Sequence, residues 1–174
     1  SALYPRVFVD WVRSNGKYLR RGAILTDVSG VKACVVPVVQ EMLGGRAEFV
    51  PAHPMAGREF SGIENSDAGI FKGANFIITP TPRNTPENIA VVEDMARDMG
   101  FGKISSLTPE KHDEMVGFLS QLTHCIAVAL MTCKDSRHLV DYTGDSFRDL
   151  TRIARINEEM WTELFLENRE ELLG

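Results

Sequence analysis

The sequence has few cysteines, no block of basic residues and no long apolar run. Its three cysteines, Cys34, Cys125 and Cys133, lack the spacing of a zinc site, so neither a disulfide framework nor a bound metal is expected. With 19 basic and 24 acidic residues the net charge is −5, which argues against a nucleic-acid-binding surface. The longest apolar run, residues 125–131, is too short to cross a bilayer, and the N-terminus does not resemble a signal peptide. We therefore expect a cytoplasmic protein that binds neither nucleic acid nor membrane.

The sequence also lacks a glycine-rich turn of the kind that holds a dinucleotide pyrophosphate. The Gly-Phe-Gly segment at residues 100–102 follows a predicted helix rather than a strand and has no third glycine. A helix is predicted almost at once, with only residues 1–3 left of any preceding strand. We therefore expect this chain to be part of a longer protein.

Residues 1–107 alternate between short β-like runs and helical patterns, which predicts an α/β domain. The chain has 174 residues, 44% of them hydrophobic, which is enough to bury a core. Thr85 followed by Pro86 is typical of a helix start, as N-cap and first-turn proline. Strands are predicted at residues 23–28, 48–52, 75–79 and 103–107, and helices at residues 5–20, 31–43 and 85–100.

After residue 107 the pattern is helical throughout, so residues 108–174 are predicted to form a separate all-α domain. One long helix is predicted from Thr108-Pro109 to about Cys133, with more helix at residues 146–156 and 158–173. These helices have more apolar surface than so thin a domain can hide. We therefore expect a symmetric dimer whose interface includes residues 147–165.

His53 is the first candidate for a catalytic base. It follows the apolar run of residues 49–52, so a strand there would place the imidazole at its carboxyl end, where ligands bind in open α/β sheets. Pro54 limits the backbone freedom of the residue before it, and imidazole suits acid–base chemistry near neutral pH. The alternative is a structural histidine that caps the strand.

The turn T-D-V-S-G-V-K at residues 26–32 brings a hydroxyl, a carboxylate and an ammonium close together between a strand and a helix. Such turns often hold a phosphate or a cofactor, which makes Thr26, Asp27 and Ser29 candidate binding residues. In the alternative interpretation Asp27 or Ser29 caps the following helix and Lys32 is solvated.

Asp113, Gly117, Ser120 and His124 are spaced to share one face of the long helix. The neighbouring faces are apolar, and buried polar groups without partners are costly, so this polar stripe needs partners or a ligand. Ser120 and His124 are therefore candidates for ligand binding. The alternative for His124 is a hydrogen-bonded core histidine.

Arg148 and Arg152 lie one turn apart on a predicted helix, an arrangement suited to holding a carboxylate. The alternative is a solvated face on which Asp149 and Arg152 form an ordinary helical ion pair. Trp161, further along, is expected in the core or in a subunit interface.

Together these segments resemble the prephenate dehydrogenase family, in the family's order and with suitable separations, from about residue 23 to residue 168. The matching motifs are T-D-V-S-G-V-K at 26–32, H-P-M-A-G-R-E at 53–59 with Ser61-Gly62, L-S-Q-L-T-H at 119–124, and G-D-S-F-R-D-L-T-R-I-A at 144–154 followed by N-x-x-M-W. The resemblance implies the C-terminal part of a Rossmann-type nucleotide-binding domain, followed by a helical dimerisation domain. It also implies a homodimer with the active site in the cleft between the two domains.

The resemblance implies a reaction as well: oxidative decarboxylation of prephenate to 4-hydroxyphenylpyruvate in tyrosine biosynthesis, with NAD or NADP as hydride acceptor. Arogenate is the alternative substrate. His53 would accept the proton of the substrate hydroxyl with help from Ser29, while Arg152 and His124 would bind substrate carboxylates. By the same matching, the supporting substrate residues are Glu59 and Ser120, and those near the nicotinamide are Thr26 and Asp27.

Two features depart from the family pattern. Many members have a serine directly before the valine of the first motif, where it hydrogen-bonds the catalytic histidine, whereas this chain has Gly30 there and Ser29 one position earlier. The first βαβ unit with its glycine-rich turn is also missing, so these residues alone should bind dinucleotide poorly. The alternative to a dehydrogenase is a non-catalytic helical dimerisation module that carries a partial α/β lobe.

Overall fold

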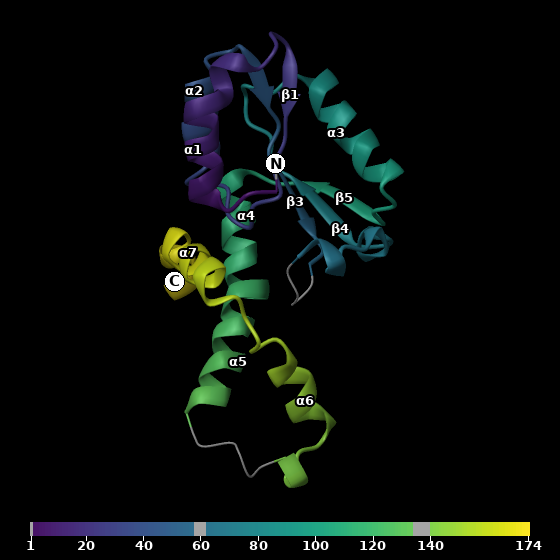
Figure 1. Cartoon of the computed structure of the whole chain (residues 1–174), viewed down its shortest axis with the longest axis vertical. Helices are drawn as coiled ribbons and strands as arrows, with labels where there is room; N and C mark the ends of the chain where they lie inside the picture. The colour runs from purple at the N-terminus through teal and green to yellow at the C-terminus, as the bar shows by residue number, and fades with distance from the viewer. Residues whose placement is uncertain (1, 58–61, 134–139) are drawn as a thin grey trace. The chain divides into compact units, whose positions relative to one another are not determined.

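The computed structural model describes residues 2–57, 62–133 and 140–174. The chain forms two compact units, Ser1–Asp113 and Glu114–Gly174. In the first unit, short strands alternate with helices (Figure 1). In chain order its elements are α1 (Pro5–Asn15), η1 (Gly16–Tyr18), β1 (Ala23–Leu25), α2 (Val36–Leu43), β2 (Ala47–Phe49), β3 (Ala52–Met55), η2 (Ile63–Asn65), η3 (Ala68–Phe71), β4 (Asn75–Ile78), α3 (Pro86–Asp98) and β5 (Lys103–Ser106).

The strands form two small sheets that meet at Pro51. β1 and β2 are parallel, while β3 runs antiparallel to β4, which is parallel to β5. The single strand predicted at residues 48–52 is therefore wrong, and the reason is Pro51, which has no N–H to donate. Val50 N–H still donates to the Leu25 carbonyl (2.9 Å), but the Pro51 carbonyl accepts from Thr79 N–H (2.9 Å). The chain thus changes partner strand immediately before His53.

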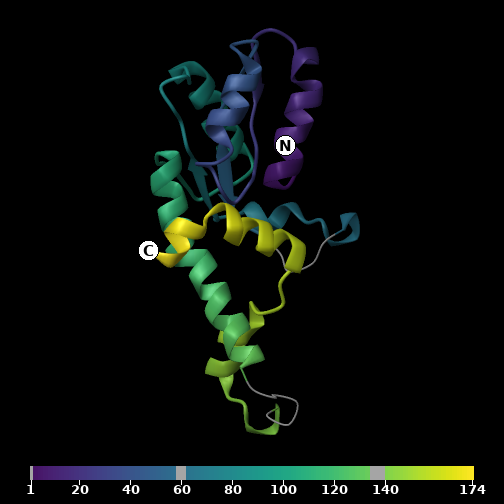
Figure 2. The ribbon, with the colours of Figure 1, turned by 90° about the vertical axis from the view of Figure 1, so that its left-hand side faces the viewer.

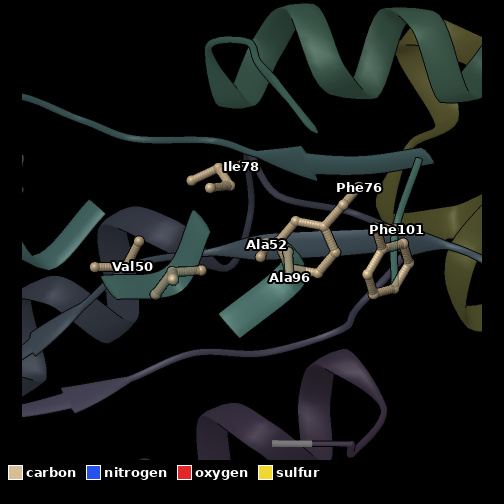
Figure 3. Packing of buried hydrophobic residues seen from close by; sticks show 7 residues of the cluster. Val50, Ala52, Phe76, Ile78, Ala96 and Phe101 are labelled. Carbon is tan, nitrogen blue, oxygen red and sulfur yellow. The ribbon is translucent and has the colours of Figure 1, made fainter. Parts of the chain in front are cut away.

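A buried apolar cluster holds β3 and β4 against α3 (Figure 3). Phe76 of β4 packs on Phe101 with ring centroids 4.8 Å apart. Burying side chains of this size contributes roughly 1.5–3 kcal/mol each, so the cluster fixes the strand that carries His53. Its buried members are Val50, Ala52, Phe76, Ile78, Val92, Ala96 and Phe101.

The start and end of α3 follow the sequence signals. The Thr85 hydroxyl accepts from Asn88 N–H (3.4 Å), which confirms the predicted N-cap. After the helix, Gly100 has φ +88°, and a Cβ on Gly102 would lie 2.8 Å from the Gly73 carbonyl oxygen. The glycines at 100 and 102 thus serve a left-handed turn and a close backbone approach.

The second unit is helical, and a wider π-type turn, η4 (Gly117–Gln121), interrupts the predicted long helix between α4 (Pro109–Val116) and α5 (Leu122–Thr132). Gly117 admits the C-terminal segment closely, because a Cβ there would lie 3.1 Å from the Glu171 carbonyl oxygen. Figure 2 shows this yellow segment crossing the green helix. The remaining elements are η5 (Val140–Tyr142), α6 (Asp145–Arg152), α7 (Glu158–Glu167) and α8 (Arg169–Leu173).

Within the described residues, one helix, Pro109–Thr132, is long and apolar enough to cross a membrane by length and composition alone. Polar residues divide the apolar residues of this helix, so the sequence has no long uninterrupted apolar run here. Two of them, Asp113 and Gln121, are buried and hydrogen-bonded within the protein. Its apolar side chains are largely on the surface, including Phe118, Leu119, Ile126 and Leu130.

Candidate functional site

His53 lies beyond the carboxyl end of β2 but on a strand of its own, β3, opposite Ile77 of β4. Its Nδ1 atom is 2.8 Å from Nε2 of His112, and the two rings meet edge to face with centroids 5.0 Å apart. The antiparallel pairing of β3 with β4 fixes the backbone on one side, and His112 fixes the ring on the other.

His112 is fully buried and is itself held by the next residue. Its Nδ1 atom lies 2.6 Å from Oδ1 of Asp113. The Asp113 carboxylate also accepts the backbone N–H groups of Lys32 (2.9 Å) and Ala33 (2.8 Å). These bonds within the first unit tie the start of α4 to the turn that follows β1.

The surroundings of His53 favour the neutral imidazole. Burial lowers the pKa of His53 well below its ordinary value, and His112 and the Lys32 ammonium lower it further. A histidine of this kind is unprotonated at pH 7 and can accept a proton.

The turn after β1 is organised around a buried ion pair. Lys32 is 0% exposed, and its Nζ atom donates to Asp27 Oδ2 (2.7 Å) and to the Ala52 carbonyl (2.6 Å). Burial lowers the pKa of Lys32, against the opposing effect of Asp27. The alternative interpretation, a solvated Lys32, is therefore wrong.

Asp27 and Ser29 are also buried, and their polar atoms are bonded within the protein. Asp27 accepts from Ala52 N–H (3.1 Å) and Ser29 N–H (3.1 Å), and the Ser29 hydroxyl donates to Asp27. The Ser29 hydroxyl in turn accepts from Lys32 Nζ (3.3 Å). Thr26 is half-buried at the end of β1. These bonds make the turn rigid, and they place His112 rather than Ser29 beside Nδ1 of His53.

The helix predicted at residues 31–43 begins only at Val36. The N–H groups of Lys32 and Ala33, in the turn before the helix, donate to Asp113.

In the second unit, His124 is half-buried, and its Nδ1 atom lies 2.8 Å from the Ser120 carbonyl oxygen. Since a carbonyl only accepts, Nδ1 donates this bond, and Nε2 is the ring nitrogen left to face a ligand. The ring stacks on Trp161 with centroids 3.8 Å apart. The π-type turn therefore positions His124 through the Ser120 backbone, with Trp161 as a flat support.

Two buried amide side chains, Gln121 at the end of η4 and Asn168 between α7 and α8, join these parts of the second unit. Asn168 Nδ2 donates to Gln121 Oε1 (2.9 Å), and Gln121 Nε2 donates to the Leu164 carbonyl (3.2 Å). This network anchors the C-terminal helices to the turn that carries Ser120.

Arg152 is exposed at the last position of α6. Arg148, one turn earlier, lies 3.6 Å from Asp145 and donates to the Thr143 carbonyl (3.2 Å). Arg148 is therefore engaged with the start of its own helix. Glu59, the other predicted substrate residue, lies outside the described residues.

His112 and the structural role of Lys32 were missed by sequence reasoning. Asp113 shares the predicted polar stripe with His124, but its carboxylate bonds to His112 and to the backbone of Lys32 and Ala33. The available signal is the His112-Asp113 pair in the first turns of the helix that follows β5.

Two family models match the chain: the nucleotide-binding domain of prephenate dehydrogenase over residues 4–105 and its dimerization domain over residues 108–174. The chain therefore belongs to the prephenate dehydrogenase family. The family resemblance and the predicted fold class, a Rossmann-type domain followed by a helical one, are both confirmed.

The chain is 32% identical to cyclohexadienyl dehydrogenase of Zymomonas mobilis over 161 residues and 28% identical to prephenate dehydrogenase of Bacillus subtilis over 155 residues. These alignments cover 89% and 86% of this chain but 54% and 42% of those proteins. The chain thus spans about half the length of these relatives.

Two solved structures are also similar. Prephenate dehydrogenase of Aquifex aeolicus, in complex with hydroxyphenyl propionate and NAD+, has a TM-score of 0.87 and 32% identity over 99% of this chain and 61% of that one. Arogenate dehydrogenase of Synechocystis has a TM-score of 0.80 and 27% identity over 99% of this chain and 63% of that one.

Proposed function

We propose that the protein containing this chain oxidatively decarboxylates prephenate, with NAD or NADP as hydride acceptor. The observation that carries the proposal is the half-buried His53, whose pKa is lowered by its surroundings and whose ring is held by His112, in a chain of this family. The Aquifex aeolicus relative, a prephenate dehydrogenase, was solved with NAD+ and a hydroxyphenyl compound. Arogenate is the second candidate substrate, because the Synechocystis relative is an arogenate dehydrogenase.

His53 would take the proton of the substrate's ring hydroxyl. A bound nicotinamide supplies the hydride acceptor, which receives the ring hydrogen with both electrons of its C–H bond. As His53 removes the hydroxyl proton, the C–O bond becomes a carbonyl. The bond to the ring carboxylate then breaks, its electron pair restores aromaticity as CO2 leaves, and the carbonyl oxygen regains a proton. These reaction steps require His53 to begin as the neutral imidazole.

The described residues fit the nicotinamide end of a dinucleotide. Residues 26–31 follow the carboxyl end of β1, the edge where ligands bind in such sheets. The polar side chains of Asp27 and Ser29 form hydrogen bonds within the protein. Val28 is 41% exposed and offers an apolar surface to a planar ring. The sequence contains no glycine-rich turn for the pyrophosphate. We therefore assign the turn, with Thr26 and Asp27, the task of shaping this end of the site.

Arg152 and His124 would bind the substrate carboxylates. Arg152 is exposed and presents a planar guanidinium that can bond both oxygens of a carboxylate. His124 has Nδ1 committed to the Ser120 carbonyl, so Nε2 is the atom it can direct to a ligand, and Nε2 must carry a proton to donate to a carboxylate. Ser120 thus supports the site through its backbone.

We also propose that the second unit forms a homodimer. The matching model is that of a dimerization domain, and apolar side chains such as Ile126 of α5 and Leu150 of α6 are exposed. Ile126→Glu should make the protein sediment as a monomer at micromolar concentration. Val91→Glu, on an exposed position of α3, is the matched control and should leave the dimer intact. Dimers of unchanged stability in Ile126→Glu would argue against this face.

The reaction is tested in the longest polypeptide of the reading frame that contains this chain. Prephenate and arogenate are each supplied with NAD+ and with NADP+, and reduced cofactor and CO2 are measured. We expect equal amounts of both products with at least one combination. A polypeptide that binds dinucleotide but reduces none with either substrate would contradict the proposal.

A further inference from the structure

The bonds from Asp113 through His112 to His53 have a defined direction. Asp113 faces the backbone N–H groups of Lys32 and Ala33, which can only donate, so its carboxylate acts as acceptor. Nδ1 of His112, 2.6 Å from the same carboxylate, must therefore carry a proton.

In its neutral form His112 carries only this one N–H, so its second nitrogen is an acceptor, whereas a protonated His112 would donate to His53 and reverse the tautomer. Nε2 of His112 faces Nδ1 of His53 at 2.8 Å, so with His112 neutral His53 donates across this contact. The neutral His53 ring then has its proton on Nδ1 and its lone pair on Nε2.

We propose that His112 and Asp113 are positioning residues that fix the tautomer of His53, so that Nε2 is the atom that accepts the substrate's hydroxyl proton. The assignment of the proton acceptor rests on the proposed function, whereas the fixed tautomer is a property of the folded chain.

The opposite tautomer is disfavoured by the same contacts. With its proton on Nε2, His53 would turn a lone pair toward the lone pair of a neutral His112, and both nitrogens would lack a donor. Since His112 is 0% exposed, water cannot replace the missing donor. The charged groups around the pair, Lys32 with Asp27 and the Asp113 carboxylate, are held by bonds of their own.

The tautomer can be read without turnover, by nitrogen NMR of the 174-residue chain labelled at its four histidines. We expect His53, at a pH where it is neutral, to show Nδ1 as the protonated nitrogen and Nε2 as the unprotonated one. The reverse assignment in the unsubstituted chain would overturn the proposal.

Two substitutions at position 112 separate positioning from packing. His112→Gln can place an amide oxygen near the former Nε2 and should keep the proton on Nδ1 of His53. His112→Leu removes the acceptor, and the proton should move to Nε2. His124→Gln, in the second unit, is the control and should leave the His53 signals unchanged.

An unchanged tautomer in folded His112→Leu would overturn the proposal. If that variant does not fold, the unsubstituted chain and His112→Gln decide the question. The predicted tautomer in a protein without dehydrogenase activity would refute the proposed function alone, and the opposite tautomer in an active enzyme would refute this inference alone.

Discussion

Replacing Lys32 by Met should destabilise the first unit strongly. Methionine retains most of the apolar stem and removes the ammonium, which lies 2.7 Å from Asp27 and 2.6 Å from the Ala52 carbonyl. The variant therefore tests whether this buried ion pair holds together the end of β1 and the strand that carries His53.

The magnitude follows from the groups left behind. Removing one partner of a buried ion pair typically costs about 3–5 kcal/mol, because the other charge remains buried without its partner. Asp27 would retain the N–H groups of Ser29 and Ala52 and the Ser29 hydroxyl, which moderates the loss. The Ala52 carbonyl would lose a donor, at a cost of about 1–3 kcal/mol. We expect a total loss of about 3–5 kcal/mol in the free energy of unfolding.

The measurement is urea denaturation followed by Trp11 fluorescence in a Trp161→Phe background, so that the signal comes from the first unit. A double-mutant cycle with Asp27→Asn isolates the pair. Because the double variant leaves no unpaired charge, it should be more stable than the sum of the single losses predicts. A loss below about 1 kcal/mol in Lys32→Met, or strict additivity in the cycle, would refute the reasoning.

Two further predictions concern His53 and Arg152. Burial lowers the pKa of His53 in the folded protein below its unfolded value of about 6.5. The stability that neutral His53 contributes is therefore fully present above about pH 6.5 and is lost as the pH falls through the folded pKa. Thermal melts between about pH 5 and 8 should show this loss, and His53→Gln should reduce it; an equal loss in the variant would contradict the assignment. Arg152→Lys keeps the charge but not the planar fork, so KM for the substrate should rise at least about tenfold, or about 1.4 kcal/mol, with little change in Tm. Arg148→Lys, at a residue engaged with Asp145 and Thr143, is the control, and equal KM values in both variants would return Arg152 to a structural role.

Local signals predicted most of the fold. Proline and threonine at a helix start, as at Thr85-Pro86, act through neighbouring backbone atoms, and the structure has the cap as expected. The predicted bounds of helices and strands are wrong where residues distant in sequence bond to the segment or where the hydrogen-bonded partner strand changes. The helix after β1 starts late, after a turn whose N–H groups at Lys32 and Ala33 donate to Asp113, far along the chain. The strand before His53 divides because Pro51 cannot donate to a neighbour.

The candidate site was partly predictable for the same reason. The apolar run before it and the proline after it indicate His53 as a candidate, which stays a prediction, and helical spacing predicts the closeness of Ser120 and His124. The partner of His53 could not be found from spacing, since His112 lies on an element 59 residues away. The buried Lys32 was also out of reach, because its burial depends on Asp27 and on the Ala52 carbonyl of another strand.

The most direct test of the central claim is the turnover of His53→Asn in the longest polypeptide of the reading frame. Asparagine keeps a polar side chain but cannot accept the proton. We predict a fall in kcat of roughly 10²–10⁴-fold with little change in KM, the range expected for loss of a general base. Near-normal turnover in a folded His53→Asn variant would contradict the account.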